Sequence, residues 1–278
     1  MADTNRATNS QGKPVTKKER REIAREKARI LREQEEKRKK RNRTLAVFGG
    51  VIGLVLIIFA IMQIFGNDKA DFDGEVRPAE LANVTDDYGI DIDENGAAGS
   101  PVPDAGLFSV YSDYTCSGCI HLETASAENY RNLTSSGQMA LRFYPVATLG
   151  NDISSNMAAA MFYVATYAPE QAFAFNEALF DQAYTTVIKR GPAPSETDIA
   201  EIAASVGVPA DVVADLPASI SSDDWQTVTD EATDAFRAKG YSGTPTLEVN
   251  GEENTAWLEN GDVASVMQLA IDAGAPEN

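Results

Sequence analysis

The sequence predicts an α/β domain that is preceded by a single transmembrane helix. Two observations lead to this fold class: an uncharged apolar stretch lies between Arg43 and Asp68, and strand-like and helix-like segments alternate from about Tyr88 onward. The chain has 278 residues, of which 43% are hydrophobic and 24% charged, so it is long enough to bury one medium-sized core. We therefore expect an arm, a membrane segment, a linker and one folded domain.

Residues 1–43 form a basic arm. They hold 16 Lys and Arg against 7 Asp and Glu, a net charge of +9. The whole chain has 24 basic and 42 acidic residues, so the remainder holds 8 and 35, a net charge of −27. We expect a solvated cytoplasmic helix whose charges act as a topology signal, with attraction to anionic lipids as the alternative. The acidic remainder argues against nucleic acid as a partner.

Residues 44–65 are expected to span the membrane. Of these 22 residues 17 are apolar, and the run without any charge has 24 residues. At about 1.5 Å per residue, a helix of that length spans roughly 36 Å, more than a hydrocarbon core of about 30 Å. A cleaved signal peptide is the alternative, but its apolar region has about 7 to 15 residues behind a short basic start. The run here is longer and follows 43 residues, which favours an uncleaved anchor.

The charges on the two sides of this segment predict its orientation. Six of the seven residues in Lys37–Arg43 are basic, whereas acidic residues follow the apolar run, beginning with Asp68. Because positive charge stays in the cytoplasm, we expect a single-pass protein of the cell membrane with a cytoplasmic N-terminus and an extracytoplasmic domain. Residues 66–87 are acidic, contain Pro78 and hold few large apolar residues. We expect them to be a linker.

The folded domain is expected to occupy residues 88–278. A strand at Leu107–Tyr111, rich in β-branched and aromatic residues, runs into a helix that ends near Leu133. The Asn250-Gly251 pair predicts a tight hairpin turn. The other expected strands are 139–146, 246–249 and 255–258, and the other expected helices are 156–167, 171–182, 196–206, 223–239 and 262–273.

The chain has two cysteines, Cys116 and Cys119, which form a C-x-x-C where the first strand meets its helix. On a helical turn, residues i and i+3 bring their Cα atoms within about 5 to 6 Å, a distance that a disulfide tolerates. The helix start offers unpaired N–H groups and about half a positive charge, which stabilise a thiolate on Cys116 and lower its pKa. This placement predicts a dithiol that exchanges disulfides with other chains.

Three other interpretations of the pair are weaker. A structural staple that closes so short a loop removes only roughly 2 kcal/mol of chain entropy, against about 4.7 kcal/mol for a loop of about 100 residues. A zinc site needs more ligands, and His121 projects about 160° away from Cys119 around the helix. Two unbridged thiols would rarely persist so close together in an oxidising compartment. We therefore expect no metal site, and we expect His121 on the surface or in a groove.

Other candidate residues give weaker signals. Asp113, three residues before Cys116, could relay a proton near the second thiol, but a solvated aspartate at the strand end is the favoured interpretation. Trp225 and Trp257 are expected to be packing residues. The sequence has no phosphate-binding loop, no Ser-His-Asp set and no carboxylate cluster with metal-ligand spacing, so no cofactor is expected.

Three segments of the domain match motifs of one known family. Tyr111–Cys119 is similar to a strand that leads into a C-x-x-C, and Gly240–Gly251 is similar to a loop with a cis-proline ahead of a strand and hairpin. The helical stretch between them, about 150–239, takes the place of a helical insertion. Over residues 88–278 the chain thus resembles the DsbA-like thiol-disulfide oxidoreductases of actinobacteria, which are membrane-anchored. The resemblance implies a thioredoxin-like mixed sheet with a DsbA-type helical insertion.

The resemblance also implies roles for individual residues. Cys116 would be the attacking cysteine and Cys119 the buried resolving one. Thr244-Pro245 would be a cis peptide beside the sulfurs, with a backbone that pairs with an extended substrate chain; a trans-proline turn is the alternative. A quinone-linked membrane partner would reoxidise the pair. One departure is Ser117-Gly118, where the strongest oxidants of the family carry Pro-His. This difference leaves the redox potential open and predicts a smaller lowering of the Cys116 pKa.

These observations predict a membrane-anchored thiol-disulfide oxidoreductase that introduces disulfides into exported cysteine-containing polypeptides. A disulfide reductase or isomerase of the same fold is one alternative, because the Ser-Gly pair suits a more balanced redox equilibrium. A second alternative, of another class, is an acidic extracytoplasmic binding or chaperone-like module with an incidental dithiol.

Overall fold

The structure is a computed structural model that describes residues 76–259 and 261–274. The basic arm at 1–43, the transmembrane helix predicted at 44–65 and residues 66–75 of the predicted linker lie outside these ranges. Within them, no helix is both long and apolar enough to cross a membrane.

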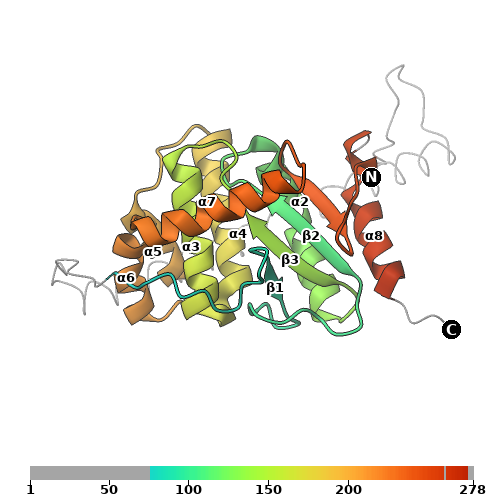
Figure 1. The fold of residues 1–278 in the computed structure, drawn as a ribbon, viewed down its shortest axis with the longest axis horizontal. Coiled ribbons are helices and arrows are strands. Elements are labelled where there is room, and N and C mark those ends of the chain that lie inside the picture. The colour runs from blue at the N-terminus through green and yellow to red at the C-terminus, as the bar shows by residue number, and fades with distance from the viewer. Residues whose placement is uncertain (1–75, 260, 275–278) are drawn as a thin grey trace, which may run out of the picture. The chain divides into compact units, whose positions relative to one another are not determined.

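Five strands form one mixed sheet, in the order β1-β3-β2-β4-β5 (Figure 1). The central strand β2 is parallel to β3 and antiparallel to β4, while β1 and β5 pair antiparallel at the two edges. The strands are β1 (Ile90–Ile92), β2 (Leu107–Ser112), β3 (Ala140–Pro145), β4 (Thr246–Val249) and β5 (Glu252–Glu253). This confirms the mixed sheet that the sequence predicted.

Seven α-helices pack around this sheet in the part of the chain that the structure describes. They are α2 (Ser117–Ser135), α3 (Asp152–Tyr167), α4 (Ala172–Ala183), α5 (Glu196–Ser205), α6 (Ala210–Ile220), α7 (Asp223–Ala238) and α8 (Val263–Gly274). Short 3-10 helices occupy Pro169–Gln171 and Ala256–Glu259, and a π-helical turn occupies Tyr184–Ile188. The helices α3 to α7 lie between β3 and β4, where the sequence predicted a helical insertion.

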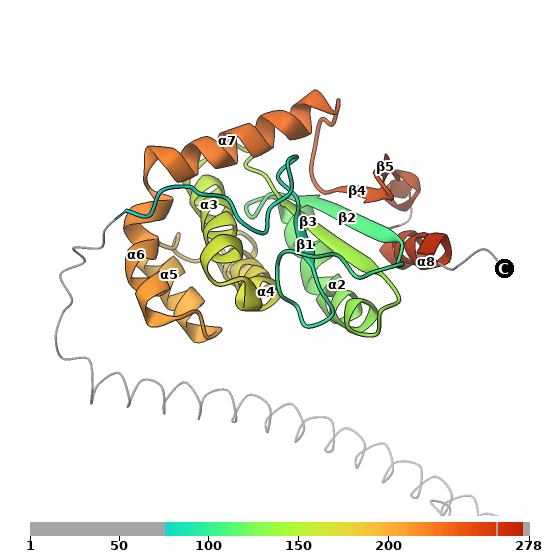
Figure 2. The same cartoon turned by 60° about the horizontal axis from the view of Figure 1, so that its bottom comes forward.

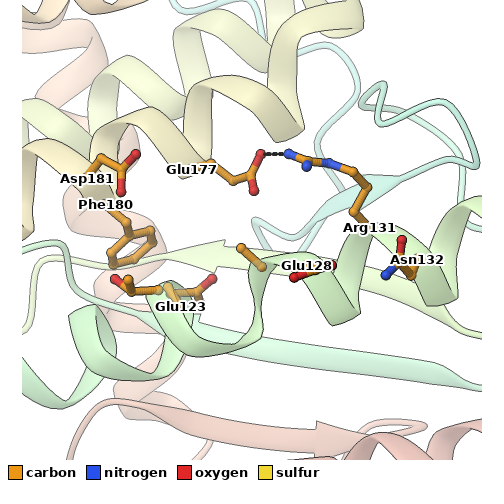
Figure 3. A pocket seen from close by; sticks show the side chains of 9 residues that line it. Glu123, Glu128, Arg131, Asn132, Glu177, Phe180 and Asp181 are labelled. Carbon is orange, nitrogen blue, oxygen red and sulfur yellow. Dashed lines mark hydrogen bonds and ion pairs between the residues drawn. The ribbon is translucent and has the colours of Figure 1, made fainter. Parts of the chain in front are cut away.

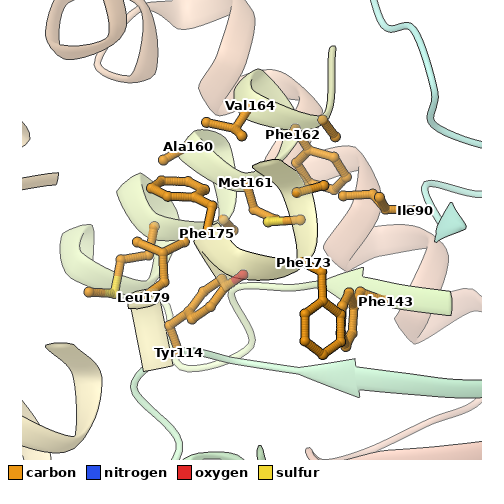
Figure 4. Close-up of a cluster of buried hydrophobic side chains, with 14 of the residues drawn as sticks. Ile90, Tyr114, Phe143, Ala160, Met161, Phe162, Val164, Phe173, Phe175 and Leu179 are labelled. Carbon is orange, nitrogen blue, oxygen red and sulfur yellow. The ribbon is translucent and has the colours of Figure 1, made fainter. Parts of the chain in front are cut away.

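The core of the insertion is α3, because this helix is hydrophobic on all sides. Every residue of Met157–Ala165 is fully buried, as expected for a helix with no polar face. Figure 4 shows Met161 and Phe162 of α3 in one cluster with Phe173 of α4. The Phe173 ring lies 6.0 Å from the Phe143 ring of β3, measured between centroids. One continuous core therefore joins the insertion to the sheet.

The two faces of the sheet differ, because successive side chains of a strand point to opposite faces. On one face, Phe108 of β2 is fully buried and its ring lies 5.6 Å from that of Tyr130 of α2. On the other face, Tyr111 stacks on Tyr144 with centroids 4.0 Å apart. There the buried Glu248 accepts a hydrogen bond from the Tyr111 hydroxyl at 3.1 Å. The first face is covered by apolar packing and the second by aromatic rings with a polar network.

Several elements differ from the prediction, among them β1 (Ile90–Ile92), which was not predicted. No helix was predicted over α6, since Pro217 interrupts its helical pattern; the helix nevertheless contains this proline. The strand predicted at 255–258 is wrong, because this segment is mostly the 3-10 helix Ala256–Glu259. The predicted Asn250-Gly251 turn is confirmed, and both of its residues have positive φ. A two-residue turn places the returning strand directly after it, at Glu252–Glu253.

Residues 76–87 also differ from the prediction, because this part of the expected linker packs on the insertion (Figures 1 and 2). The Arg77 guanidinium forms an ion pair with Asp215 of α6 at 2.6 Å. The Trp225 indole N–H of α7 donates to the Arg77 carbonyl at 2.8 Å, and the Tyr167 hydroxyl donates to the Pro78 carbonyl at 2.6 Å. The sequence suggested a solvated linker because these partners are all about 90 or more residues away along the chain.

Candidate active site

The C-x-x-C pair lies between the end of β2 and the first turn of α2. Cys116 is the N-cap of α2, with φ −78° and ψ 118°, and Cys119 is the third helical residue. The Ile120 N–H donates to the Cys116 carbonyl at 3.0 Å, which closes the first helical turn. Both cysteines are free thiols; Cys116 is half-buried and Cys119 is 0% exposed. The predicted position of the pair at the helix start is confirmed.

The Thr244-Pro245 peptide is cis, as predicted. Cys116 Sγ lies 3.2 Å from the Thr244 carbonyl oxygen, to which the protonated thiol donates a hydrogen bond. A Cβ added to Gly118 would lie 3.2 Å from Pro245 Cδ and 3.8 Å from Cys116 Sγ. The proline loop therefore packs directly on the C-x-x-C turn and leaves little room for a larger residue at position 118.

The two sulfur atoms have opposite electrostatic environments. The pKa of the Cys116 thiol is lowered to about 5, and the largest cause is a hydrogen bond from the Cys119 thiol. Hydrogen bonds from the Cys119 and Gly118 N–H groups and from the Thr244 side chain lower it further, whereas burial acts in the opposite direction. Burial raises the pKa of the Cys119 thiol well above its ordinary value, and the neighbouring Cys116 raises it further. At neutral pH Cys116 is therefore a thiolate and Cys119 a thiol.

Asp113 is 0% exposed, so the favoured prediction of a solvated aspartate is wrong. One carboxylate oxygen accepts hydrogen bonds from the Thr115 N–H, the Thr115 hydroxyl and the Ser154 hydroxyl, at 2.8, 2.9 and 2.6 Å. The other accepts from the Leu149 N–H at 2.9 Å and the Thr148 hydroxyl at 3.2 Å. These donors replace the water that a solvated carboxylate would bind, which makes the burial of Asp113 possible.

The contacts of Asp113 with the cysteines involve its backbone. The Asp113 N–H donates to Cys119 Sγ at 3.4 Å, whereas no hydrogen bond joins its carboxylate to either sulfur among the described residues. Thr148, which Asp113 holds, places its hydroxyl oxygen 3.4 Å from that of Thr244. Asp113 thus connects the C-x-x-C loop, the β3–α3 loop and the proline loop. A proton relay by its carboxylate stays a prediction.

Two further residues of this network were not predicted. Asn151 caps α3 by accepting from the Ser154 N–H at 3.0 Å, and its amide donates to the Thr115 hydroxyl at 2.9 Å. An asparagine before a helical segment is a recognisable N-cap signal, so this position could have been found. Thr148 carries no such signal, because only the fold brings it to Thr244.

Two cavities that share Trp257 lie near the site, one beside the proline loop and one beside the cysteine turn. One, of about 260 Å³, is lined by Thr244, Pro245 and Trp257. The other, of about 410 Å³, is lined by Gly118, His121 and Trp257. The prediction that Trp257 only packs is therefore incomplete, since this half-buried side chain lines both cavities. His121 is exposed, as predicted.

A third cavity, of about 430 Å³, lies between α2 and α4. Figure 3 shows Glu177 and Asp181 of α4 facing Glu123 and Arg131 of α2, with Arg131 paired to Glu177. Glu123 is almost fully buried and accepts one hydrogen bond, from the Ser112 hydroxyl at 3.0 Å. Burial raises the pKa of Glu123 to about 8. This buried acid was not predicted, although it lies four residues after Cys119, on the same helix face.

The comparisons with known proteins agree with this architecture. The family model described as thioredoxin matches residues 103–267, more than half of the chain. No curated protein matches the chain. Among solved structures, MdbA from Actinomyces oris, a thiol-disulfide oxidoreductase, is 24% identical with a TM-score of 0.60, over 70% of this chain and 93% of MdbA.

Two other solved structures show the same similarity. MdbA from Corynebacterium diphtheriae is 19% identical with a TM-score of 0.54, over 74% of this chain and all 100% of that one. Reduced DsbA from Mycobacterium tuberculosis is 23% identical with a TM-score of 0.51, over 67% of this chain and 97% of DsbA. The chain therefore belongs to the thioredoxin family, and its fold is that of the DsbA and MdbA thiol-disulfide oxidoreductases.

Proposed function

We propose that this protein is a membrane-anchored thiol-disulfide oxidoreductase that introduces disulfides into exported cysteine-containing polypeptides. The observation that carries the proposal is the contrast between its two sulfur atoms. Cys116 is half-buried, with a pKa of about 5, and Cys119 is buried, with a raised pKa. A disulfide that only held the chain together would need no stabilised thiolate next to two cavities.

The reaction starts with a disulfide between Cys116 and Cys119. A substrate thiolate attacks Cys116 Sγ, the bond between the two cysteines breaks, and its electron pair leaves on Cys119 Sγ, which takes up a proton. A second substrate thiolate then attacks the substrate sulfur of the mixed disulfide, and Cys116 leaves as a thiolate. The substrate gains one disulfide and loses a pair of electrons, and the protein is left reduced.

The Thr244 backbone has the position to hold the substrate during this exchange. Its carbonyl oxygen lies 3.2 Å from Cys116 Sγ, so a substrate sulfur bonded to Cys116 would lie beside the same backbone. An extended polypeptide pairs with such a backbone as an added strand would, through main-chain hydrogen bonds that do not depend on sequence. We propose that Thr244 and Pro245 bind substrate in this way.

The lowered pKa of Cys116 favours the oxidase direction over a reductase or isomerase. A stabilised thiolate stabilises the reduced protein and so makes its disulfide more oxidising. The value of about 5 lies between about 7 for thioredoxin and about 3.5 for the strong oxidant DsbA. Equilibration with glutathione tests the direction: a reduction potential nearer about −120 mV supports the oxidase, and one nearer about −270 mV supports the reductase.

The membrane anchor and the redox partner belong to the same proposal. The support for the anchor is the uncharged run of 24 residues behind a basic arm. An oxidase needs a partner that takes two electrons from the reduced pair in each cycle, and a quinone-linked membrane protein is the proposed acceptor. Labelling of a residue near the C-terminus in intact cells tests the orientation; labelling only after the membrane is permeabilised would contradict it.

The test of the activity is oxidation of a reduced two-cysteine polypeptide by the preoxidised protein. We expect Cys116→Ser to abolish disulfide transfer and Cys119→Ser to accumulate a mixed disulfide with the substrate, visible in a non-reducing gel. Equal transfer by the wild type and both variants would overturn the proposal. Binding of substrate at unchanged affinity, with no transfer by the wild type, would instead support a chaperone-like module.

A further inference from the structure

Among the residues that the structure describes, two basic residues form no ion pair with a carboxylate. The described residues hold seven Lys and Arg against thirty Asp and Glu. Five of the seven form ion pairs within 4 Å of an Asp or Glu: Arg77, Arg131, Arg142, Arg237 and Lys239. The other two, Lys189 and Arg190, are adjacent and exposed, and no ion pair joins them to the described carboxylates. In so acidic a domain, two neighbouring unpaired cations are a distinct surface feature.

The backbone holds these two cations in a fixed turn. They follow the π-helical turn Tyr184–Ile188, and the Lys189 N–H donates to the Tyr184 carbonyl at 3.0 Å. Arg190 has φ +56°, and the next N–H, of Gly191, donates to the Thr185 carbonyl at 2.9 Å. A Cβ on Gly191 would lie only 2.9 Å from that carbonyl oxygen. This tight turn, rather than a long flexible loop, presents both side chains.

The turn lies against the helix that carries the cysteines. The Lys189 ammonium is 5.1 Å from the centroid of the Tyr184 ring, and that ring is 6.4 Å from the His121 ring of α2 in an edge-on arrangement. His121 lines the cavity of about 410 Å³ together with Gly118 of the C-x-x-C turn. We call His121, Lys189 and Arg190 the basic corner. Through His121, the basic corner borders the cavity that reaches Gly118 of the C-x-x-C turn.

The spacing between Cys116 and His121 suits a polypeptide substrate. His121 follows Cys116 by five positions along α2, an axial rise of about 7.5 Å. An extended chain covers that distance in about two to three residues. A substrate bound through its cysteine therefore has its neighbouring residues within reach of the basic corner. The same cavity is also lined by Asp262, which accepts from the Ser265 N–H at 3.1 Å.

We propose that the basic corner recognises acidic side chains that flank the reacting cysteine of the substrate. This inference rests on the proposed function and adds a substrate class to it. At physiological salt, charges interact over about 8 Å. A substrate residue beside the basic corner is therefore attracted by its cations more strongly than it is repelled by the more distant carboxylates of the domain. Without the basic corner, an acidic polypeptide would meet no basic side chain beside the cysteine turn among the described residues that are free of an ion pair. The basic corner raises the rate at which an acidic substrate binds in a reactive position, and it does not change the sulfur exchange itself.

Acidic polypeptides fit the basic corner better than anionic lipids do. Binding to a lipid surface requires a broad approach of the domain, and thirty carboxylates against seven cations would be repelled by that surface. A polypeptide needs only to place one short segment beside the corner. Lipid binding is therefore the alternative outcome of the test.

The test uses the full chain, preoxidised, in nanodiscs of neutral phosphatidylcholine. Two synthetic dithiol peptides differ only at the positions flanking one cysteine, which are Glu in one and Gln in the other. Single-turnover rates are measured for the wild type and for the Lys189→Gln, Arg190→Asn double variant. Asparagine is chosen at 190 because it tolerates positive φ. We expect the variant to slow the Glu peptide by about three- to tenfold and to leave the Gln peptide within about twofold.

Comparison of the same peptide between two proteins removes any effect of Glu on the reactivity of the peptide thiol itself. A charge-conserving Lys189→Arg, Arg190→Lys variant should react with both peptides as the wild type does. Arg237→Gln, which removes a cation already paired with Asp234, should also leave the rates unchanged. Salt at about 0.5 M should reduce the difference in rate with the Glu peptide, between the wild type and the double variant, to less than about twofold.

Equal slowing of both peptides, or of neither, would overturn the inference while leaving thiol exchange intact. Failure of every protein to oxidise either peptide would contradict the proposed function itself. A third result would reassign the basic corner to lipid. In it, both peptides react alike, and equimolar phosphatidylglycerol in the nanodiscs protects Lys189 of the wild type from acetylation.

Discussion

Cys116 and Cys119 lie in the same helical turn, but they differ in burial, in hydrogen-bond partners and in the direction in which their pKa is shifted. Cys116 is half-buried beside the proline loop, and its pKa is lowered to about 5. Cys119 is fully buried in the core beneath α2, and its pKa is raised. The hydrogen bond from the Cys119 thiol is the largest cause of the lowered pKa of Cys116. Each sulfur therefore helps to determine the state of the other.

The comparison teaches that the C-x-x-C spacing alone does not assign the two roles. Both cysteines are close to the start of the helix, where N–H groups stabilise a thiolate. The difference arises from burial and from groups that are distant in the sequence, above all the proline loop beside Cys116 and the Asp113 N–H beside Cys119. Four changes test how firmly the surroundings fix this difference.

The largest effect is expected from Asp113→Ala, which would leave its donors buried without an acceptor. We expect a loss of about 3 to 5 kcal/mol in the free energy of unfolding, measured in urea. Asp113→Asn should cost less, because its remaining oxygen still accepts from Thr115 and Ser154, while its amide cannot accept from Leu149. A loss below about 1 kcal/mol for the alanine variant would show that the network is not needed to hold the two loops together.

The next effect is the difference in reactivity between the two thiols. For the reduced protein at pH 7, we expect iodoacetamide to alkylate Cys116 at least about 100-fold faster than Cys119, since the thiolate is the reacting species. The rate for Cys116 should be half-maximal near pH 5. Cys119→Ala should move this midpoint upward, whereas Cys119→Ser should move it less, because a hydroxyl still donates. A midpoint near 8.5 in the wild type would mean that Cys116 is an ordinary thiol.

The third effect is on the pH dependence of stability. The pKa of Glu123 is raised from 4.5 to about 8 in the folded protein, so its contribution is present below pH 4.5 and lost as the pH rises through 8. The pKa of Cys116 is lowered from 9.0 to about 5, so its contribution is present above pH 9 and lost as the pH falls through 5. The two trends oppose each other in the reduced protein, and only the Glu123 trend operates in the oxidised one.

We therefore expect the oxidised protein to lose about 3 to 4 kcal/mol of unfolding free energy between pH 5 and pH 8, and Glu123→Gln to abolish most of this loss. Reduction of the disulfide between Cys116 and Cys119 should raise the free energy of unfolding more at pH 8 than at pH 5. Urea unfolding of both redox forms at the two pH values measures these differences. An oxidised wild type and Glu123→Gln with the same pH dependence would exclude Glu123 as the cause.

The smallest effect is expected from Gly118→Ala. The added methyl would lie 3.2 Å from Pro245 Cδ and 3.8 Å from Cys116 Sγ, so it removes water from the sulfur and pushes on the proline loop. Less solvation disfavours a thiolate and raises the pKa of Cys116. We expect thiol exchange at pH 5 to slow by about two- to threefold, measured by stopped flow, with Ser117→Ala as the matched control. A faster exchange would show that flexibility at Gly118 limits the rate.

Local signals predicted the parts of the site that are close in sequence. A few neighbouring residues determine each of four features: the strand before Cys116, the helix after it, the Asn250-Gly251 turn and the cis-proline motif. The burial of Asp113 was not predicted, because three of its five donors come from residues 148–154. The unpaired state of Lys189 depends on which carboxylates the fold brings near, and no sequence pattern gives that.

The Asp113 carboxylate receives hydrogen bonds from the loop after β2, from the loop after β3 and from α3 itself. Any hinge that opened the helical insertion away from the sheet at this point would strip a buried anion of its donors, at a cost of several kcal/mol. The loops beside Cys116 therefore keep a fixed position against the insertion. In the proposed exchange, the substrate segment that carries the cysteine would have to adapt to this rigid site.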